Sequence, residues 1–387
     1  MSRQLATLFA AASLLLVSGC STVSNAIDTV NPFSGSATKL PPLAPLNPTA
    51  DVRTAWSADI GKAGDYRFTP AVVGDAVYVA AHDGTMMRLE AGKPVWKIKA
   101  GQQLSAGVGA NDRLVVVATA KGDVLAFSAA DGKPLWQAKV SSEVLAAPVV
   151  GNEGVAVKSG DNLVHLLDAG DGGKKWVYQR LTPPLSVRAT GVPVFADKYL
   201  FVGYPGGKLV ALSLQNGAPV WEGAVALPKG ATELDRVADV VASPIVDGRQ
   251  LCAVAFQGRV ACFDMGQSGA MMWSRDISSA TGLSMDTRYI FVSDDKGVVY
   301  ALDRQSGSSL WKQDKLKGRG LSAPVVQRGL VAVADSAGIV HFLSREDGSF
   351  AARQKTDGTP VYAPLQVLGS SFLVQSSGGY VGAIEAQ

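Results

Sequence analysis

The sequence predicts an all-β protein: a single eight-bladed β-propeller of four-stranded antiparallel blades, closed by an N-terminal strand that pairs with the C-terminal blade. Three observations lead to this prediction. A tryptophan-bearing unit recurs about every 40 residues, a glycine before the third strand of each unit recurs eight times, and an orphan fourth strand lies near the N-terminus. Four short strands per unit at this period are typical of propeller blades.

The composition of the 387-residue chain favours a folded body. Apolar residues make up 47% and charged residues 18% of the chain, a balance that excludes a disordered protein. The 36 basic and 33 acidic residues leave a net charge of +3 and are scattered along the chain. This distribution argues against nucleic acid as a partner.

The N-terminus has the features of a secretion signal. The apolar stretch at residues 5–17 is too short to span a bilayer as a permanent helix. Its end, Val17-Ser18-Gly19-Cys20, resembles a bacterial lipobox. We therefore expect a lipoprotein signal peptide at 1–19 and lipidation of Cys20. Ser21 stands where an inner-membrane retention signal usually has Asp, and this implies by resemblance a lipid-anchored protein of the outer membrane.

Residues 20–50 are predicted to be a flexible tether. They contain five prolines and no apolar periodicity, and the prolines are Pro32, Pro41, Pro42, Pro45 and Pro48. Such a linker holds a folded body away from its anchor. The propeller is then expected over residues 51–387.

Each unit of the repeat has a glycine-bearing turn, a third strand, a second glycine turn and a fourth strand with tryptophan. The clearest copies are residues 122–136, 207–221 and 297–311. The glycine before the third strand recurs at Gly84, Gly122, Gly160, Gly207, Gly258, Gly297, Gly338 and Gly379. The chain therefore contains eight units.

Two units lack the tryptophan. The seventh has Arg353 in its place, which we interpret as a plain degeneracy. The eighth stops after its third strand, at residues 380–384, and the segment 52–60 with Trp56 is the strand that would complete it. Pairing the two ends closes the ring and removes an exposed sheet edge.

The tryptophans are predicted to be structural residues that wedge between neighbouring blades, because each has the same place in its unit. They are Trp56, Trp96, Trp136, Trp176, Trp221, Trp273 and Trp311. A platform for a sugar or a quinone is the alternative.

Cys252 and Cys262 flank a short turn at Gln257-Gly258. A two-residue turn would place Cys252 opposite Phe263, whereas a three-residue loop would align the two sulfurs for a disulfide. Both arrangements remain open, and we expect two buried free thiols.

Two connections break the period of the repeat. Successive tryptophans are 40, 40, 40, 45, 52 and 38 residues apart, so the connections after Trp176 and Trp221 are enlarged. Both run from an outer strand to the inner strand of the next blade, which places them side by side on one rim. Enlarged loops on a regular scaffold favour docking.

The sequence offers little for catalysis. The histidines, His82, His165 and His341, lack the spacing of metal ligands, and no nucleophile elbow, phosphate loop or dinucleotide motif is present. Asp-Gly pairs such as Asp131-Gly132 are explained by tight turns. We therefore predict no enzyme activity, no metal and no cofactor.

The repeat Ala301-Leu-Asp-Arg-Gln-Ser-Gly307 leading to Trp311 resembles those of pyrroloquinoline-quinone-dependent dehydrogenases. With the lipobox and the tether, nearly the whole chain resembles the BamB family of outer-membrane protein assembly lipoproteins. The resemblance implies a non-enzymatic scaffold on the periplasmic face of the outer membrane. The scaffold would dock on the periplasmic domains of BamA, among other members of the assembly complex.

The resemblance also implies a site. Segments of the form Leu-Ser-x-Arg and Glu-x-Asp-Arg-x-x-Asp-Val are implicated in BamA binding in that family, and they match the two enlarged connections. The residues carried over are Leu185, Val187, Arg188, Asp235, Arg236 and Asp239. Val241 stands where the resemblance implies another acid.

Three alternatives accompany this hypothesis. Arg188 and Asp239 would brace the loops if they paired with each other or with Arg236 and Asp235. An outer strand would accept an unfolded outer-membrane protein by β-augmentation. The chain would otherwise be a quinone-binding oxidoreductase relic or a propeller that binds a small ligand in its central channel.

Overall fold

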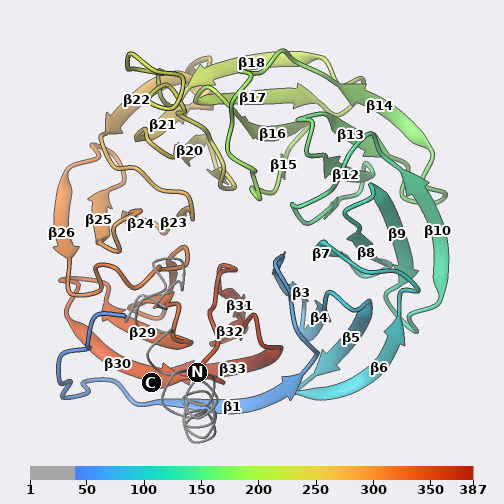
Figure 1. The fold of residues 1–387 in the computed structure, drawn as a ribbon. Helices are drawn as coiled ribbons and strands as arrows, with labels where there is room; N and C mark the ends of the chain where they lie inside the picture. Colours follow the sequence, from blue (N-terminus) through green and yellow to red (C-terminus); the bar gives the residue numbers. More distant parts are fainter. Residues whose placement is uncertain (1–39, 387) are drawn as a thin grey trace, which may run out of the picture. The chain divides into compact units, whose positions relative to one another are not determined.

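The computed structural model describes residues 40–386, and in this range the chain forms eight antiparallel sheets arranged in a ring (Figure 1). The regular structure described consists of β-strands and one short 3-10 turn. The predicted eight-bladed propeller is therefore confirmed.

The first four blades follow one another along the chain, each from its inner to its outer strand. Blade one contains β3 (Ala71–Val73), β4 (Ala76–Ala80), β5 (Thr85–Glu90) and β6 (Lys93–Lys99). Blade two contains β7 (Ala106–Ala110), β8 (Leu114–Ala118), β9 (Asp123–Ser128) and β10 (Pro134–Lys139), with β2 (Arg67–Phe68) added in parallel to β7. Blade three contains β11 (Val149–Val150), β12 (Val155–Lys158), β13 (Val164–Leu167) and β14 (Lys174–Tyr178). Blade four contains β15 (Val194–Ala196), β16 (Tyr199–Tyr204), β17 (Lys208–Ser213) and β18 (Pro219–Ala224).

The remaining blades continue the ring. Blade five contains β19 (Ile245–Asp247), β20 (Gln250–Val254), β21 (Val260–Asp264), the 3-10 turn η1 (Met265–Gln267) and β22 (Ala270–Arg275). Blade six contains β23 (Leu283–Met285), β24 (Tyr289–Ser293), β25 (Val299–Asp303) and β26 (Ser309–Gln313). Blade seven contains β27 (Val325–Gln327), β28 (Leu330–Ala334), β29 (Ile339–Ser344) and β30 (Phe350–Lys355). Blade eight contains β31 (Gln366–Leu368), β32 (Ser371–Gln375), β33 (Tyr380–Ala386) and the N-terminal strand β1 (Val52–Asp59).

The ring closes as the sequence predicts. Strand β1 pairs antiparallel with β33, with Val52 opposite Ala386 and Asp59 opposite Tyr380 (Figure 1). The last blade thus takes its outer strand from the other end of the chain, and the edge of β33 is covered.

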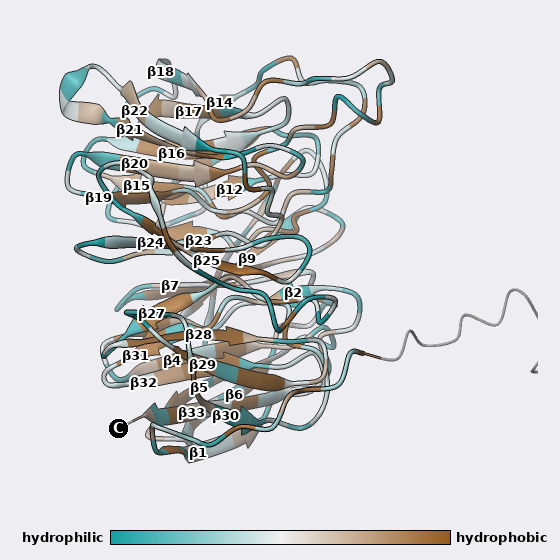
Figure 2. Ribbon diagram, turned by 90° about the vertical axis from the view of Figure 1, so that its left-hand side faces the viewer, coloured by the Kyte–Doolittle hydropathy of each residue, from teal (hydrophilic) through white to brown (hydrophobic). Residues whose placement is uncertain are grey.

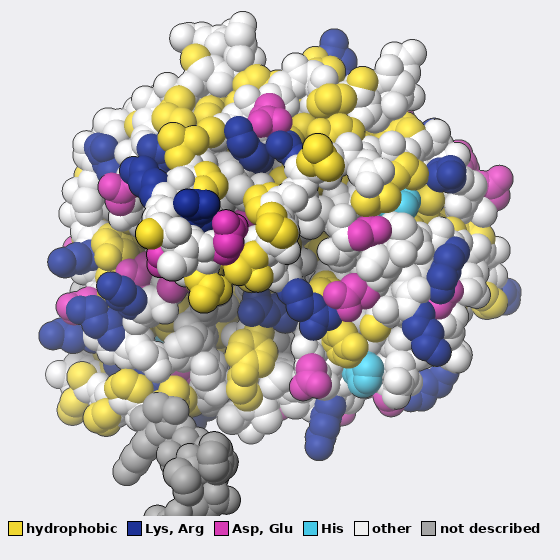
Figure 3. All heavy atoms as spheres, turned by 45° about the horizontal axis from the view of Figure 1, so that its top comes forward, with side chains coloured by type: hydrophobic (Ala, Val, Ile, Leu, Met, Phe, Trp, Pro, Cys, Tyr) yellow, Lys and Arg dark blue, Asp and Glu magenta, His cyan; other side chains and the backbone are white. Residues whose placement is uncertain are grey.

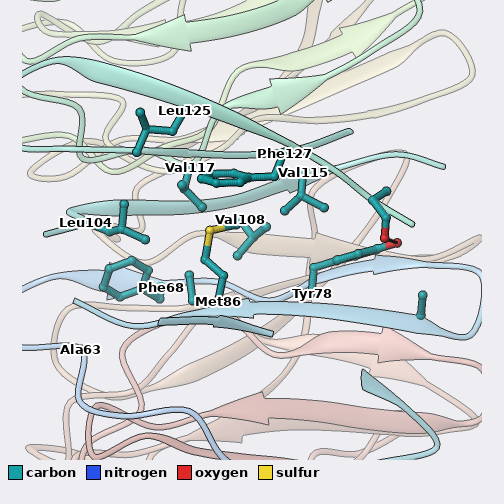
Figure 4. Close-up of a cluster of buried hydrophobic side chains, with 13 residues drawn as sticks. Ala63, Phe68, Tyr78, Met86, Leu104, Val108, Val115, Val117, Leu125 and Phe127 are labelled. Atoms are coloured by element: carbon teal, nitrogen blue, oxygen red, sulfur yellow. Dashed lines mark hydrogen bonds between the residues drawn. The ribbon is translucent and has the colours of Figure 1, made fainter. Parts of the chain in front are cut away.

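The core of the propeller lies between neighbouring sheets. Between blades one and two, Met86 and Tyr78 pack against Val117 and Phe127 (Figure 4). The middle strands β4 and β8 are buried throughout, because both faces of a blade are covered by its neighbours. They therefore read as continuous apolar runs such as Leu-Val-Val-Val-Ala.

Each tryptophan packs on the next blade. Its ring lies against the glycine of the turn between the third and fourth strands of that blade, and this glycine has a φ between +68° and +78°. A side chain there would meet the ring as well as an unfavourable backbone conformation. The pairs are Trp56 with Gly92, Trp96 with Gly132, Trp136 with Gly172, Trp176 with Gly217, Trp221 with Gly269, Trp273 with Gly307 and Trp311 with Gly348.

The prediction that Arg353 takes the place of the tryptophan in the seventh unit is wrong. Ala352 holds that position, because it pairs with Phe342 as Trp311 pairs with Ala301, and Arg353 is the next residue. The blade that follows, the eighth, has no turn between third and fourth strands, because these strands come from opposite ends of the chain. A tryptophan in blade seven would therefore have no turn glycine to pack on. Arg353 donates a hydrogen bond to the Ala44 carbonyl oxygen at 2.7 Å, and the Ala351 carbonyl accepts one from Thr49 N–H at 2.8 Å. The end of the predicted tether thus lies along blade seven.

The expectation of free thiols is wrong, because Cys252 and Cys262 form a disulfide. The hairpin between β20 and β21 has the three-residue loop that aligns the two sulfurs. Ala255 N–H donates to the Arg259 carbonyl, so that Phe256 to Gly258 form the loop. The two cysteines are consequently directly opposed.

The predicted signal peptide (1–19), lipidated Cys20 and most of the tether lie outside the described residues. Within residues 40–386, no helix has the length and apolar character needed to cross a membrane.

Candidate functional site

The two enlarged connections lie together on one face of the propeller. We call residues 179–193, between β14 and β15, the first connection, and residues 225–244, between β18 and β19, the second connection. Figure 2 shows long loops extending past the strand ends near β14 and β18. The two connections touch directly, since Val192 N–H donates to Ser243 Oγ at 2.9 Å. The regular up-and-down blades position both loops on the same rim.

Asp239 is the residue that joins the connections. Its side chain is 1% exposed, and its carboxylate accepts hydrogen bonds from Val187 N–H at 2.7 Å and from Gly206 N–H at 2.9 Å. Its backbone pairs in both directions with Phe256 at the tip of the β20–β21 hairpin. One side chain therefore connects the first connection, the second connection and the β16–β17 turn.

A buried lysine lies beneath this joint. The Lys158 ammonium donates to the Gly203 carbonyl oxygen at 2.7 Å and lies 5.2 Å from the centre of the Tyr204 ring. Burial lowers the pKa of Lys158 to about 8, although the negative charge of Asp239 acts in the opposite direction. Arg180 lies 5.4 Å from the same ring centre and pairs with Glu222 at 2.9 Å. The floor of the site is thus a layer of two cations and one aromatic ring.

The other predicted residues of the first connection point outward or lie at the surface. Leu185 is 41% exposed, and Val187 is half-buried. The Arg188 guanidinium, whose side chain is 68% exposed, pairs with Glu143 of the neighbouring loop at 2.6 Å. The structure does not contain the proposed Arg188 to Asp239 pair.

In the second connection, Asp235 and Arg236 are exposed and make local contacts. The Asp235 carboxylate accepts hydrogen bonds from Thr232 Oγ1 and N–H, and these bonds lower its pKa. Arg236 pairs with Glu233 at 3.3 Å. These contacts shape a turn whose outer side is open to solvent.

Besides the predicted Leu185, three exposed leucines lie in the two connections and are not among the residues predicted from the sequence. Leu181 is 98% exposed, Leu227 57% and Leu234 70%. Figure 3 shows apolar side chains gathered on this side of the ring, with cationic and anionic side chains among them. The sequence carries no clear signal for the exposure of these leucines, because Val240 and Val241 of the second connection are also apolar and outside the strands but are buried.

The described histidines have structural partners. His82 Nδ1 is 2.7 Å from the Leu104 carbonyl oxygen, His165 contacts Ser141 and Ser159, and His341 contacts the Asp335 carboxylate. Over residues 40–386, no three acidic, histidine or cysteine side chains are grouped as metal ligands would be. A depression of about 420 Å³ lies where the inner strands meet, and Arg67 and Tyr362 are among the residues that line it.

The chain matches a family model described as outer membrane protein assembly factor BamB over residues 88–313 and 296–387. It is 40% identical over 385 residues to the protein of that name from Burkholderia pseudomallei, covering 98% of both chains. It is 43% identical over 361 residues to that of Pseudomonas aeruginosa, covering 92% of this chain and 95% of the relative.

Solved structures show the same architecture. The crystal structure of BamB from Moraxella catarrhalis superposes with a TM-score of 0.81 at 28% identity, over 87% of this chain and all of that one. A quinohemoprotein alcohol dehydrogenase from Comamonas testosteroni superposes with a TM-score of 0.69 at 12% identity, over 86% of this chain and 76% of that one. The second likeness concerns the fold alone.

Proposed function

Because this chain belongs to the BamB family of outer membrane protein assembly factors, we propose that it is a non-enzymatic scaffold in the assembly of β-barrel proteins at the outer membrane. The observation that supports a scaffold is the pair of connections joined by Asp239. They depart from an otherwise regular ring and present apolar and charged side chains outward.

The partner that we propose for this surface is the periplasmic part of BamA. Leu181, Leu185 and Leu234 supply exposed apolar groups of the kind that form the centre of an interface. Arg188 supplies a guanidinium at the rim. Asp239 is buried, so its contribution is to hold the two connections in one geometry rather than to contact the partner.

The anchor that we propose is the lipid on Cys20. A permanent anchor at the N-terminus and a tether would keep the propeller on the periplasmic face of the outer membrane, close to a membrane-embedded partner.

Direct capture of unfolded chains by the outer strands has less support. Each outer strand carries a register shift at the tryptophan position, where one residue bulges out of the pairing. Bulges at sheet edges disfavour the addition of a further strand. We therefore place partner binding in the connections.

The test is binding of the body lacking residues 1–20 to the periplasmic domains of BamA, measured by calorimetry. Leu185→Ser and Leu234→Ser are each expected to weaken binding about tenfold or more, since truncated anchors at the centre of an interface cost about 2 kcal/mol. Arg188→Ala is expected to slow association and to reduce its salt dependence.

Leu135→Ser is the matched control, because Leu135 is 52% exposed on the outer strand β10, away from the connections. It should bind BamA like the wild type. Unchanged binding by folded Leu185→Ser and Leu234→Ser proteins would refute the proposed surface.

A further inference from the structure

A groove of about 380 Å³ lies between blades four and five. Blade four contributes the aromatic side chains of Tyr199, Phe201 and Trp221, and blade five contributes the turn that contains Met265. The turns that line it join first to second strands and third to fourth strands. In up-and-down blades these turns lie on the face opposite the two long connections, so the groove is separate from the proposed docking surface.

The same position between blades six and seven is filled by an arginine of the chain itself. The Cζ atom of Arg345 lies 4.2 Å from the centre of the Tyr289 ring, and its Nε donates to the Asp286 carboxylate at 2.6 Å. The Arg345 carbonyl oxygen accepts the indole N–H of Trp311 at 2.9 Å. Stacking, ion pair and indole hydrogen bond thus hold one arginine residue.

Arg304 fills the interface between blades five and six in a similar way. Its carbonyl oxygen accepts the indole N–H of Trp273 at 2.9 Å, and its guanidinium pairs with Asp247 at 2.7 Å. Nε of Arg304 also donates to Gln250, the residue of blade five that is equivalent to Tyr289 of blade six. Two neighbouring interfaces therefore use an arginine at this turn position.

Blade five has Met265 where blades six and seven have these arginines. The equivalence follows from the backbone, because Met265 N–H donates to the Arg249 carbonyl as Arg345 N–H donates to that of Gly329. The turn of blade five is one residue longer and forms η1. Within residues 40–386, Trp221 Nε1–H has no hydrogen-bond acceptor, unlike the indoles of Trp273 and Trp311.

An aromatic ring and a carboxylate, the groups that hold Arg345, are also present at the groove between blades four and five. Tyr199 lines the groove with only Lys198 over its ring, at 5.7 Å, whereas Tyr289 has two arginines. Asp197 is an exposed carboxylate at the groove. It lies one residue later in the first turn of blade four than Asp286 does in the first turn of blade six. The other cation at the groove, Arg249, is already paired with Asp264 at 3.3 Å.

We propose that this groove binds an arginine side chain presented by a segment of a partner protein. The guanidinium packs on Tyr199 beside Asp197, and the carbonyl oxygen of the arginine accepts the indole N–H of Trp221. The partner thus supplies in trans what Arg345 supplies within the chain.

The test uses the full chain in detergent, labelled with ¹⁵N, and blocked tripeptides with a central arginine, citrulline or lysine. The indole N–H resonance of Trp221 is assigned by its absence in Trp221→Phe. The arginine peptide is expected to shift this resonance to saturation, with an affinity at least tenfold higher than that of the uncharged citrulline peptide. The lysine peptide should bind more weakly than the arginine peptide, because it lacks a planar group to stack.

Met265→Arg is expected to abolish this response by filling the groove as Arg345 does. Met271→Arg, on the exposed outer strand of the same blade, is the matched control and should respond like the wild type. Equal shifts with the arginine and citrulline peptides, no shift of Trp221, or full binding by Met265→Arg would each overturn the proposal.

Discussion

At the scale of single residues, the candidate site depends on two polar groups that the solvent does not reach. Asp239 is buried and accepts two backbone N–H groups, and Lys158 is 5% exposed beneath it. The sequence predicts that Asp239 supplies charge to a partner, whereas the structure buries its carboxylate between the two connections. Its burial follows from the approach of three separate loops, which no local pattern encodes.

Lys158 gives the stability a pH dependence. Its pKa is about 8 in the folded protein against an ordinary 10.5, so between these values the unfolded chain binds the extra proton. The free energy of unfolding should rise as pH increases from 8 to 10.5, by up to about 3 kcal/mol, since one pKa unit corresponds to about 1.4 kcal/mol.

Denaturant unfolding of the wild type and of Lys158→Met at several pH values in this window measures the effect. The rise should be smaller in Lys158→Met by that amount, because its side chain does not titrate. Lys175→Met is a control for general lysine titration, because Lys175 is exposed on β14. Parallel pH profiles for wild type and Lys158→Met would contradict the expectation.

At the scale of the element, the junction between blades rests on a tryptophan and a glycine that are far apart in sequence. Each fourth strand that has a tryptophan bulges at the residue before it, and the ring then lies on the turn of the next blade. From the sequence, these glycines are explained by the positive φ that a tight turn requires. Only the packing shows that they also leave room for an indole ring.

The two roles of glycine can be separated. Gly307→Ala and Gly329→Ala both place a side chain at positive φ, +68° and +76°, which costs about 1 kcal/mol. At Gly307 the added methyl group would also lie 2.4 Å from Trp273, whereas at Gly329 it meets no atom within 4 Å. Gly307→Ala should therefore lose about 1–3 kcal/mol more stability in urea unfolding. Equal losses would show that the indole contact contributes nothing.

At the scale of the whole molecule, stability depends on closure between the two ends of the chain. Strand β1 covers the edge of β33, and Trp56 packs on Gly92 of blade one. The absence of a tryptophan in blade seven belongs to the same arrangement, since the discontinuous eighth blade offers no turn for it.

Removal of β1 should open the ring. A chain lacking residues 1–59 is expected to melt at a lower temperature than one lacking residues 1–41, and to self-associate through the free edge of β33. Light scattering coupled to gel filtration measures the association. A peptide of residues 51–60 added in trans should restore the monomer, and the same peptide with Trp56→Ala should do so poorly. A monomer with an unchanged melting temperature would refute the role of β1.

The sequence by itself determined the class of fold, the number of blades, the way the ring closes and the two places where the repeat is enlarged. These features follow from local periodicity, which strand alternation, turn glycines and spacing record directly. The tertiary structure alone decided the pairing of Cys252 with Cys262, the inward position of Asp239 and the open groove beside Trp221. These depend on a one-residue difference in loop length or on the meeting of distant segments, and a short-range pattern contains neither.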